Sequence, residues 1–585
     1  MSFRRKPESR NTQGFWTPVL ARLGGFAGVT AWTVFCGSAK IAVMKILLIQ
    51  PPIQDFYDTD IRLQPLGLSM LKAASKKFLP HIQVIVRDYH QGYGRKTISL
   101  PGELSYLREY FKYPDASPFS TFFHYYHFGA PFEEIGKDVA LEKPDLVGIS
   151  SLFSPYHREA LACAREIKKR INVPILMGGP HVSAAPLSEL SDPNVDFIIR
   201  GEGERPFVEF LRAWEAGLPL DRVPNLGFKR NGDPVLNPMA ENFPLDDLPP
   251  ADFSDLTPDR YLFERKPLCF ITTSRGCPHQ CTFCSVHLTF GEKFRRRSPG
   301  NVLSEIKQRY SEGYRVFDFE DDNLSFSRDD LKTILNALIA EFPVNDIRLV
   351  AMNGISYLSL DREILELMKR AGFRSLNISL VSANADVLAR LKRPHSLNKY
   401  LDVVNQAHDM GFDIVSYQIL GIPYESLEDM INTMALMASL PVLIGASIFY
   451  LTPGCPIAQE FPDLTESDIF KARSTAMALE TDQFRRDDLY TLFITARIIN
   501  FLKGLRFPEK KVSLQEALNE AENAGHREKL GAQILRKLLD ERRLYAATKV
   551  GFKPVPSFNA NLFFRVMEKS RLIRTKDGVE IILSG

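Results

Sequence analysis

The sequence is poor in cysteine, with seven among 585 residues. So few cysteines cannot form the dense disulfide framework of small secreted domains, and this class of protein is excluded. The cysteines are also unevenly distributed, because Cys277, Cys281 and Cys284 fall within a stretch of eight residues. In a reducing compartment such a group indicates a metal or redox site.

Net charge is also small, at +3. No strong overall field therefore favours binding to nucleic acid or to an anionic membrane. Long hydrophobic runs are missing beyond residue 43, so no segment there is predicted to span a membrane. The apolar content of 45% and charged content of 24% are those of a globular protein. The length allows about three or four domains of roughly 100–200 residues each.

Residues 1–43 differ in composition from the rest. Ser2–Arg10 is basic and polar, whereas Leu23–Val43 is apolar but rich in glycine. A signal peptide with small residues near Gly37–Ala39 is one interpretation, and a membrane anchor is another. We prefer Met44 as the natural start, because a predicted strand follows it at once. We therefore expect residues 1–43 to lie outside the fold and the protein to be cytoplasmic.

Residues 44–216 are predicted to alternate between strands and helices. The continuous apolar run Lys45–Ile49 is typical of a strand that is buried on both faces of a parallel sheet. Further strands are predicted at Gln83–Val86, Leu146–Ile149, Ile175–Met177 and Phe197–Ile199. With helices between them, the pattern predicts an α/β domain with a flavodoxin-like, doubly wound parallel sheet.

Two irregular segments accompany this domain. An insertion at about residues 91–130 is dense in aromatic side chains. A satellite core under a long loop is the preferred interpretation, and a wall over a flat cofactor or apolar substrate is the alternative. Residues 217–265 are rich in Pro, Asp and Asn and are predicted to form a linker, with a short hairpin around Asn231-Gly232.

A second alternation of strands and helices occupies residues 266–483. Six strands are predicted at Phe270–Thr273, Val316–Phe319, Ile347–Ala351, Ser375–Leu380, Ile414–Leu420 and Ile444–Phe449. Six such units predict a partial (β/α)6 barrel, in which chemistry takes place at the carboxyl ends of the strands. Residues 484–585 are predicted to be a mainly helical C-terminal accessory domain without a readable motif.

The three clustered cysteines follow directly on the first predicted barrel strand, with the spacing C-x3-C-x2-C. Thiolates are the ligands that iron–sulfur clusters require. Three of them leave one iron of a [4Fe–4S] cluster open for another ligand, whereas a closed structural zinc site needs four protein ligands. Cys269 is a poor fourth ligand, because it lies near the start of the strand, away from the catalytic end.

The triplet, the aromatic Phe283 before the last cysteine and the six-unit barrel together resemble the radical S-adenosylmethionine superfamily. The resemblance covers about residues 266–480. It implies that Cys277, Cys281 and Cys284 hold a [4Fe–4S] cluster, that S-adenosylmethionine binds at its open iron, and that Phe283 lies in the cofactor site.

The resemblance implies further roles for residues that follow later strands. Asp321 and Asp322 occupy the place of the acidic motif that receives the methionyl ammonium group, and a solvated acidic loop is the alternative. A glycine turn that approaches adenine is represented by Gly421, followed by Glu425. The Glu that binds ribose in many relatives is missing, and Ser379 or Ser382 is expected to replace it.

Other residues near the expected site are left open. One of Arg295, Arg296 and Arg297 is a candidate partner for the cofactor carboxylate, although a solvated basic run is an equally good interpretation. Cys455 follows the sixth strand and is more simply a small packed residue than a catalytic thiol. His395 and Tyr417 are not assigned roles.

The first domain resembles a cobalamin-binding domain. Its matching residues lie just after predicted strands, where the ligand crevice of an open parallel sheet is found; they are Ser150, Ser151, Gly178, Gly179, Gly201 and Glu202. Cobalamin is expected to bind without a histidine ligand from the protein. His90 lies in a poor match to the known histidine motif, and His181 is expected to shape its turn.

Together these resemblances imply a cobalamin-dependent radical S-adenosylmethionine enzyme. The expected function is methylation of an unactivated carbon of a small molecule. The alternatives are cyclisation or rearrangement with the same cofactors, a radical enzyme that has lost cobalamin, and a non-enzymatic iron–sulfur electron carrier or sensor. The expected partners are the substrate and an electron donor such as flavodoxin or ferredoxin, and no nucleic acid is indicated.

Overall fold

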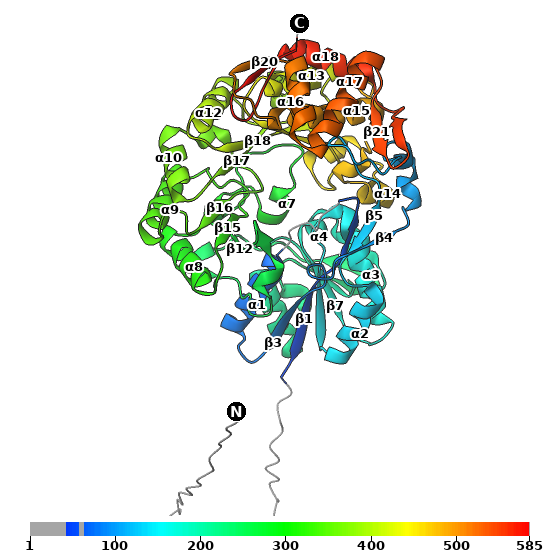
Figure 1. Cartoon of the computed structure of the whole chain (residues 1–585). Helices are drawn as coiled ribbons and strands as arrows, with labels where there is room; N and C mark the ends of the chain where they lie inside the picture. Colours follow the sequence, from blue (N-terminus) through cyan, green and yellow to red (C-terminus); the bar gives the residue numbers. More distant parts are fainter. Residues whose placement is uncertain (1–42, 58–63, 584–585) are drawn as a thin grey trace, which may run out of the picture. The chain divides into compact units, whose positions relative to one another are not determined.

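The computed structural model describes residues 43–57 and 64–583 (Figure 1). The predicted N-terminal extension lies outside these residues, apart from Val43. No helix among the described residues is long and apolar enough to cross a membrane.

The first domain contains a parallel sheet in the predicted positions. Its parallel strands run in the order β3-β1-β6-β7-β8, which is the flavodoxin-like order. The strands are β1 (Lys45–Gln50), β3 (Gln83–Asp88), β6 (Leu146–Ser150), β7 (Ile175–Gly178) and β8 (Phe197–Ile199). The predicted doubly wound sheet is therefore confirmed.

Helices cover both faces of this sheet, which explains the continuous apolar runs in its strands. On β1, Ile46 and Leu48 join one core and Leu47 and Ile49 join another. The first core includes residues of α1 and α6, and the second includes residues of α2 and α3. The helices of this domain are α1 (Leu66–Phe78), α2 (Phe132–Glu142), α3 (His157–Lys168), α4 (Pro180–Ala184), α5 (Pro186–Ser191) and α6 (Glu204–Glu215).

The predicted hairpin is present within residues 217–265. Strands β9 (Leu226–Arg230) and β10 (Asp233–Leu236) pair across Asn231 and Gly232, and both turn residues have positive φ angles. Such angles are typical of a type I′ turn. Because β9 also pairs with β8 in antiparallel orientation, the hairpin extends the sheet of the first domain. This part of the predicted linker is built into the sheet.

The aromatic insertion forms part of a larger core. Strand β5 (Tyr125–Phe128) pairs with β2 (Ile53–Asp55) and β4 (Arg95–Ile98), and a 3-10 helix spans Gly102–Glu109. The ring of Tyr110 lies 5.3 Å from that of Tyr490 in the C-terminal region. The rings of Phe119 and Phe501 lie 5.4 Å apart. The aromatic side chains are therefore packing residues, as preferred, but they join the main core rather than a satellite core.

Six parallel strands form the predicted partial barrel. Two sheets, β12-β15-β16 and β17-β18-β19, are joined by isolated bridges between Leu349 and Phe373 and between Ile355 and Ile378. The strands are β12 (Lys266–Ile271), β15 (Val316–Phe319), β16 (Arg348–Val350), β17 (Ser375–Val381), β18 (Asp413–Leu420) and β19 (Leu443–Ile448). A short strand, β11 (Leu262–Phe263), pairs with β12 in antiparallel orientation.

The barrel helices lie outside its strands (Figure 1). They are α8 (Pro299–Ser311), α9 (Arg328–Glu341), α10 (Arg362–Ala371), α11 (Ala385–Arg390), α12 (Leu397–Asp409) and α13 (Leu427–Ala438). Alternate strand residues face these helices, including Cys269, which is fully buried in their shared core. Cys269 is therefore a core residue on the helix side of β12.

The C-terminal region is mainly helical, as predicted. Its helices are α15 (Arg486–Gly504), α16 (Leu514–Ala524), α17 (His526–Glu541) and α18 (Ala560–Ser570). Small sheets accompany them, formed by β20 (Lys511–Ser513), β23 (Leu572–Arg574) and β24 (Glu580–Ile582), and by β21 (Tyr545–Thr548) and β22 (Gly551–Pro554). Buried Lys503 at the end of α15 donates to the carbonyls of Met437, Ala438 and Leu440 and so attaches this region to the barrel.

Candidate functional site

The cysteine loop leaves the carboxyl end of the first barrel strand. It runs from the short strand β13 (Ser274–Arg275) to helix α7 (Val286–Phe290). At its start Gly276 has a φ of +80°, and a Cβ atom there would lie 2.5 Å from the carbonyl oxygen of Lys293. Only glycine meets both conditions, so Gly276 fixes the path of the chain into the first cysteine.

Backbone hydrogen bonds attach this loop to two distant parts of the barrel. The amide of Thr282 donates to the carbonyl of Leu391, 3.0 Å away, after α11. The carbonyl of Thr282 accepts from the amide of Ile457, also at 3.0 Å, in the segment after β19. The middle of the cysteine loop is therefore held between the segments that follow the fourth and sixth strands.

The three thiols are free and lie near one another. Cys281 is buried, and Cys277 and Cys284 are half-buried. The pKa of Cys284 is raised to about 11, chiefly by burial and to a smaller extent by the neighbouring thiols. Burial also raises the pKa of Cys281, while the charge and a hydrogen bond of Arg393 oppose that change.

The donors around the thiols fit a thiolate-bound cluster. Asn323 donates to Cys277, Arg393 to Cys281 and the amide of Val286 to Cys284. Hydrogen bonds to the ligand sulfurs are a common feature of iron–sulfur sites. Among the described residues, no group of three His, Cys, Asp or Glu side chains is arranged to hold a single metal ion. In a [4Fe–4S] cluster, by contrast, each thiolate binds a different iron, so the three thiols need not converge on one point.

The residues after β15 form a clamp on the start of the cysteine loop. The Asp321 carboxylate accepts from the amide of Thr273 at 3.1 Å, its hydroxyl at 2.7 Å, and the hydroxyl of Ser274 at 2.5 Å. Asp322 accepts from the amide of Gly276 at 2.8 Å.

This clamp separates the roles of the two aspartates. Both oxygens of Asp321 are already engaged with the loop. Asp322 uses only Oδ2 in its bond to Gly276, and burial raises its pKa to about 6. Of the two residues predicted to meet the methionyl ammonium group, Asp322 is the one with carboxylate capacity left for a cation.

The fourth and fifth strands end in a buried polar contact. Ser382 donates to Glu425 at 2.5 Å, and the other carboxylate oxygen of Glu425 is buried without a hydrogen-bond partner. Burial raises the pKa of Glu425 to about 8. The register between β17 and β18 shifts between Ser379 and Val381, which marks a β-bulge at the end of β17. Val381 has a φ of +70° there. Such an angle is strained for a β-branched residue and is most often found at functional sites.

Gly421 and Ser379, two further residues of the predicted cofactor site, contact α15 and Arg393 respectively. Gly421 has a φ of +83°, and a Cβ atom there would lie 3.0 Å from the side chain of Leu489 in α15. The glycine is therefore required partly by packing against the C-terminal region. The carbonyl of Ser379 accepts from Arg393 at 3.0 Å.

Phe283 lies at the edge of an apolar cluster. This cluster is formed by Val381, Val387, Leu388, Leu391, Ile422, Phe449, Cys455 and Ile457. The side chains come from the end of β17 and from the segments after β17, β18 and β19, so the cluster packs beside the cysteine loop. Burial raises the pKa of Cys455 to about 12, with a smaller contribution from Cys284, as suits a packed thiol beside the loop.

Arg393 was not identified from the sequence. It follows α11, and the positive φ of Lys392 turns the chain there. Its guanidinium reaches both the thiol of Cys281 and the carbonyl of Ser379. The arginines that were considered instead are engaged elsewhere, Arg295 with Glu202, Arg296 with Asp330 and Arg297 with Glu305.

The predicted cobalamin residues gather at the carboxyl ends of β6, β7 and β8. Ser150 ends β6, and the hydroxyl of Ser151 is buried without a hydrogen-bond partner. Gly179 has a φ of +115°, and a Cβ atom there would lie 2.6 Å from the carbonyl of Ser151. By contrast, Gly178 has room for a Cβ atom, whose nearest neighbour would be 3.7 Å away. The unpartnered hydroxyl and the close turn fit a large ligand with amide groups at this edge.

Gly201 and Glu202 differ in what they offer to a ligand. Gly201 has a φ of +69°, and a Cβ atom there would lie 2.6 Å from the methyl of Met239. The carboxylate of Glu202 is occupied by two arginines of the barrel domain, Arg275 and Arg295, each at 2.6 Å. A ligand at this turn would therefore meet the backbone of Glu202 rather than its side chain.

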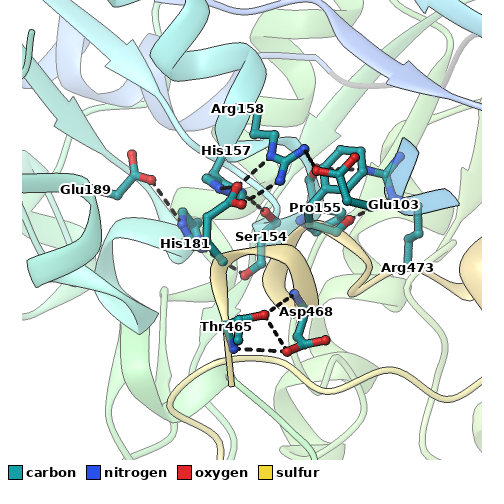
Figure 2. Close-up of polar contacts among 12 residues, drawn as sticks. Glu103, Ser154, Pro155, His157, Arg158, His181, Glu189, Thr465, Asp468 and Arg473 are labelled. Atoms are coloured by element: carbon teal, nitrogen blue, oxygen red, sulfur yellow. Dashed lines mark hydrogen bonds and ion pairs between the residues drawn. The ribbon is translucent and has the colours of Figure 1, made fainter. Parts of the chain in front are cut away.

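The histidines of this domain are engaged with protein groups. Figure 2 shows His181 between Ser154 and Glu189; its ring nitrogens lie 3.0 and 3.1 Å from their oxygens. His90 is fully buried, and its Nδ1 lies 3.4 Å from the carbonyl of Phe128. Both arrangements agree with the structural roles expected for these residues.

The same view shows how the segment that follows the last barrel strand, at residues 465–473, meets the first domain (Figure 2). Glu466, at the start of α14 (Glu466–Phe470), pairs with His157 at 3.0 Å and with Arg158 at 2.5 Å. Arg473 donates to the carbonyl of Pro155 at 2.7 Å and to Asp55 at 3.2 Å. These charged contacts are close to the carboxyl end of β6 and join the two domains there.

Comparisons with known proteins match both domains. Residues 271–437 match the model of the radical SAM superfamily, and residues 122–211 match that of the B12 binding domain. An uncharacterized methyltransferase of Pyrococcus horikoshii is 30% identical over 319 residues, which cover 53% of this chain and 68% of the relative.

Two further matches cover more of the chain. The cytidylyl-2-hydroxyethylphosphonate methyltransferase of Streptomyces wedmorensis is 26% identical over 66% of this chain and 75% of its own length. The solved structure of the radical S-adenosylmethionine methyltransferase TsrM from Kitasatospora setae, with cobalamin and a [4Fe–4S] cluster bound, covers 71% of this chain and 74% of its own, with a TM-score of 0.55 and 18% identity. At that identity the structural likeness shows a shared fold.

Proposed function

The chain belongs to the cobalamin-dependent radical S-adenosylmethionine methyltransferases, and from that premise we propose that it methylates an unactivated carbon of a small molecule. Two of its relatives are methyltransferases, which favours methyl transfer over cyclisation, rearrangement or a role as electron carrier. The observation that carries the proposal is the free thiol triplet at the end of the first barrel strand, clamped by Asp321 and Asp322.

When bound, the [4Fe–4S] cluster, S-adenosylmethionine and cobalamin supply one-electron transfer, hydrogen abstraction and carriage of the methyl group. The protein residues bind and orient them. In this proposal Cys277, Cys281 and Cys284 hold the cluster, and Asp321 fixes the loop that carries them. Phe283 and the apolar cluster around it exclude water from this side of the site.

Four groups are proposed to hold S-adenosylmethionine. Asp322 accepts the ammonium of the methionyl group, because its Oδ1 is not used by Gly276. Arg393 is the proposed partner of the carboxylate, since its guanidinium lies between Cys281 and Ser379. Ser379 is the proposed hydrogen-bond partner of the ribose, and the backbone around Gly421 and Glu425 that of adenine.

Cobalamin is proposed to bind across the carboxyl ends of β6, β7 and β8. Ser150, Ser151 and the backbone of Gly178, Gly179, Gly201 and Glu202 are its proposed contacts. Because the ring nitrogens of His181 already meet Ser154 and Glu189, we propose that no histidine of this turn binds cobalt.

The reaction also needs a low-potential electron. We propose a donor of the flavodoxin or ferredoxin class, as the sequence led us to expect, and a cytoplasmic location. A reducing compartment keeps the three thiols available for iron.

The test is anaerobic reconstitution with iron, sulfide and cobalamin, followed by reduction with dithionite in the presence of S-adenosylmethionine. We expect 5′-deoxyadenosine from the wild type. The Cys284→Ala variant should form none above background, whereas Cys269→Ala should retain activity, because Cys269 lies in the helix-side core. Equal yields from the wild type and Cys284→Ala would refute the proposal.

A further inference from the structure

Asn323 directly follows the two clamp aspartates and makes a different contact with the loop. Its Nδ2 atom lies 3.5 Å from the sulfur of Cys277, a distance that suits an N–H···S hydrogen bond. The side chain is buried, with 5% of its surface exposed. Its backbone carbonyl accepts from the amide of Phe326 at 3.1 Å, so the residue is fixed at both ends.

The orientation of the amide follows from the chemistry of its neighbour. A thiolate accepts hydrogen bonds, so it must face the NH2 side of the amide. The opposite orientation would place two acceptors against each other. Oδ1 of Asn323 is buried without a hydrogen-bond partner. If the amide group rotated by half a turn, the N–H···S bond would be lost and no new hydrogen bond would replace it.

Such a bond has a different strength in the two redox states of a cluster. Reduction adds one electron to the cluster and makes its sulfurs more negative. An N–H donor stabilises the more negative state more strongly, especially in a buried site of low dielectric constant. Hydrogen bonds to the sulfurs are one of the means by which a protein sets the potential of an iron–sulfur cluster.

We infer that Asn323 is a positioning residue that sets the reduction potential of the cluster through Cys277. This inference rests on the proposed function, since it requires a cluster on the three cysteines. Asp321 and Asp322 hold the backbone and side chains of the loop, whereas Asn323 acts on a ligand atom. Loss of its donor should make the cluster harder to reduce without preventing its assembly.

Two variants separate the donor from other effects. Asn323→Asp keeps the shape and removes the NH2 group, and Asn323→Leu removes the donor without adding an acceptor. The matched control is Asn336→Asp on the exposed face of α9, which makes the same chemical change away from the site. Iron and sulfide content is measured first, so that only loaded protein is compared.

The readout is the cluster midpoint potential, measured by titration with EPR detection of the reduced cluster. For Asn323→Asp we expect an about tenfold lower ratio of reduced to oxidised cluster at a fixed potential, which corresponds to a midpoint about 59 mV more negative for a one-electron couple. The midpoint potential of Asn323→Leu should shift in the same direction but by a smaller amount. That of Asn336→Asp should match the wild type.

The outcomes distinguish this inference from the function on which it rests. Unshifted midpoints in both loaded Asn323 variants, or a shift to more positive potential, would overturn the inference alone. A wild type that yields no EPR signal of a reduced cluster would overturn the proposed function, and the inference with it.

Discussion

Glu202 of the first domain and Arg275 of the barrel domain form a buried ion pair, with Oε1 of Glu202 2.6 Å from Nη1 of Arg275. Arg275 also pairs with Glu204, at the start of α6, through its other terminal nitrogen. The guanidinium therefore links the turn after β8 to the strand that leads into Gly276 and the cysteine loop.

Replacing Arg275 by Met should destabilise the protein strongly. It would leave Glu202 with only Arg295 and Glu204 without its partner, both buried, and an uncompensated buried charge costs about 3–5 kcal/mol. Urea unfolding measures the loss in the free energy of unfolding. The control is Arg205→Met, which removes a partly exposed pair with Asp247 and should cost about 0–1 kcal/mol. Similar losses in both variants would contradict this account of the ion pair.

Two neighbouring glycines in the predicted cobalamin turn should respond differently to a methyl group. Gly179→Ala forces a Cβ atom to within 2.6 Å of the Ser151 carbonyl at a φ of +115°, a strain of about 1–3 kcal/mol. Gly178→Ala meets its nearest atom only at 3.7 Å and should be tolerated.

Cobalamin absorbance of the reconstituted variants, together with thermal unfolding, checks this prediction. We expect Gly179→Ala to bind less cobalamin and to unfold at a lower temperature, whereas Gly178→Ala should unfold close to the wild type. If Gly178→Ala were the more damaging of the two, the proposed geometry of the turn would be incorrect.

The buried carboxyl of Glu425 predicts a dependence of stability on pH. Burial raises its pKa from 4.5 to about 8, so the folded state holds a proton that the unfolded state releases above about pH 4.5. The stabilisation from this group is complete below pH 4.5 and is lost as pH rises through about 8, at up to about 1.4 kcal/mol per pH unit.

Glu425→Gln should abolish this dependence, because the amide stays neutral and can still accept from Ser382. Urea unfolding at pH 5.5 and pH 8 should show a smaller loss for this variant than for the wild type. Glu428→Gln is the matched control, since Glu428 lies half-exposed on α13, and its change with pH should be that of the wild type. A Glu425→Gln variant that loses as much stability as the wild type would exclude a protonated Glu425.

Local pattern was enough to predict the strands that are buried on both faces of a sheet. Val316–Phe319 was predicted from its apolar run and is observed with the same bounds, because a strand buried on both faces needs such a run. Arg95–Ile98 was not predicted, since it is polar and mostly exposed. It becomes a strand only through pairing with Tyr125–Phe128, about thirty residues away.

The partners of charged side chains could not be predicted in the same way. Glu202 was expected to face cobalamin, yet both its oxygens meet arginines that lie far along the sequence. Arg393 and Asn323 reach the cysteine loop because of how the chain turns after the fourth and second barrel strands. These contacts depend on tertiary structure, which the spacing of motifs in one sequence does not encode.

Asp321→Asn tests the clamp on the cysteine loop. The change replaces one acceptor oxygen by a donor, although Thr273 and Ser274 present three donors to this side chain. At least one donor would then face another donor in a buried site, a cost of about 1–3 kcal/mol. The loop should shift, because a cost of about 1 kcal/mol already changes the ratio of two conformations about fivefold. Iron bound per chain after reconstitution should therefore fall. Asp329→Asn on the exposed start of α9 is the control and should bind iron as the wild type does, since its side chain is exposed to solvent. Full iron content in Asp321→Asn would mean that Asp321 does not hold the loop, and the ammonium role first expected for it would again be open.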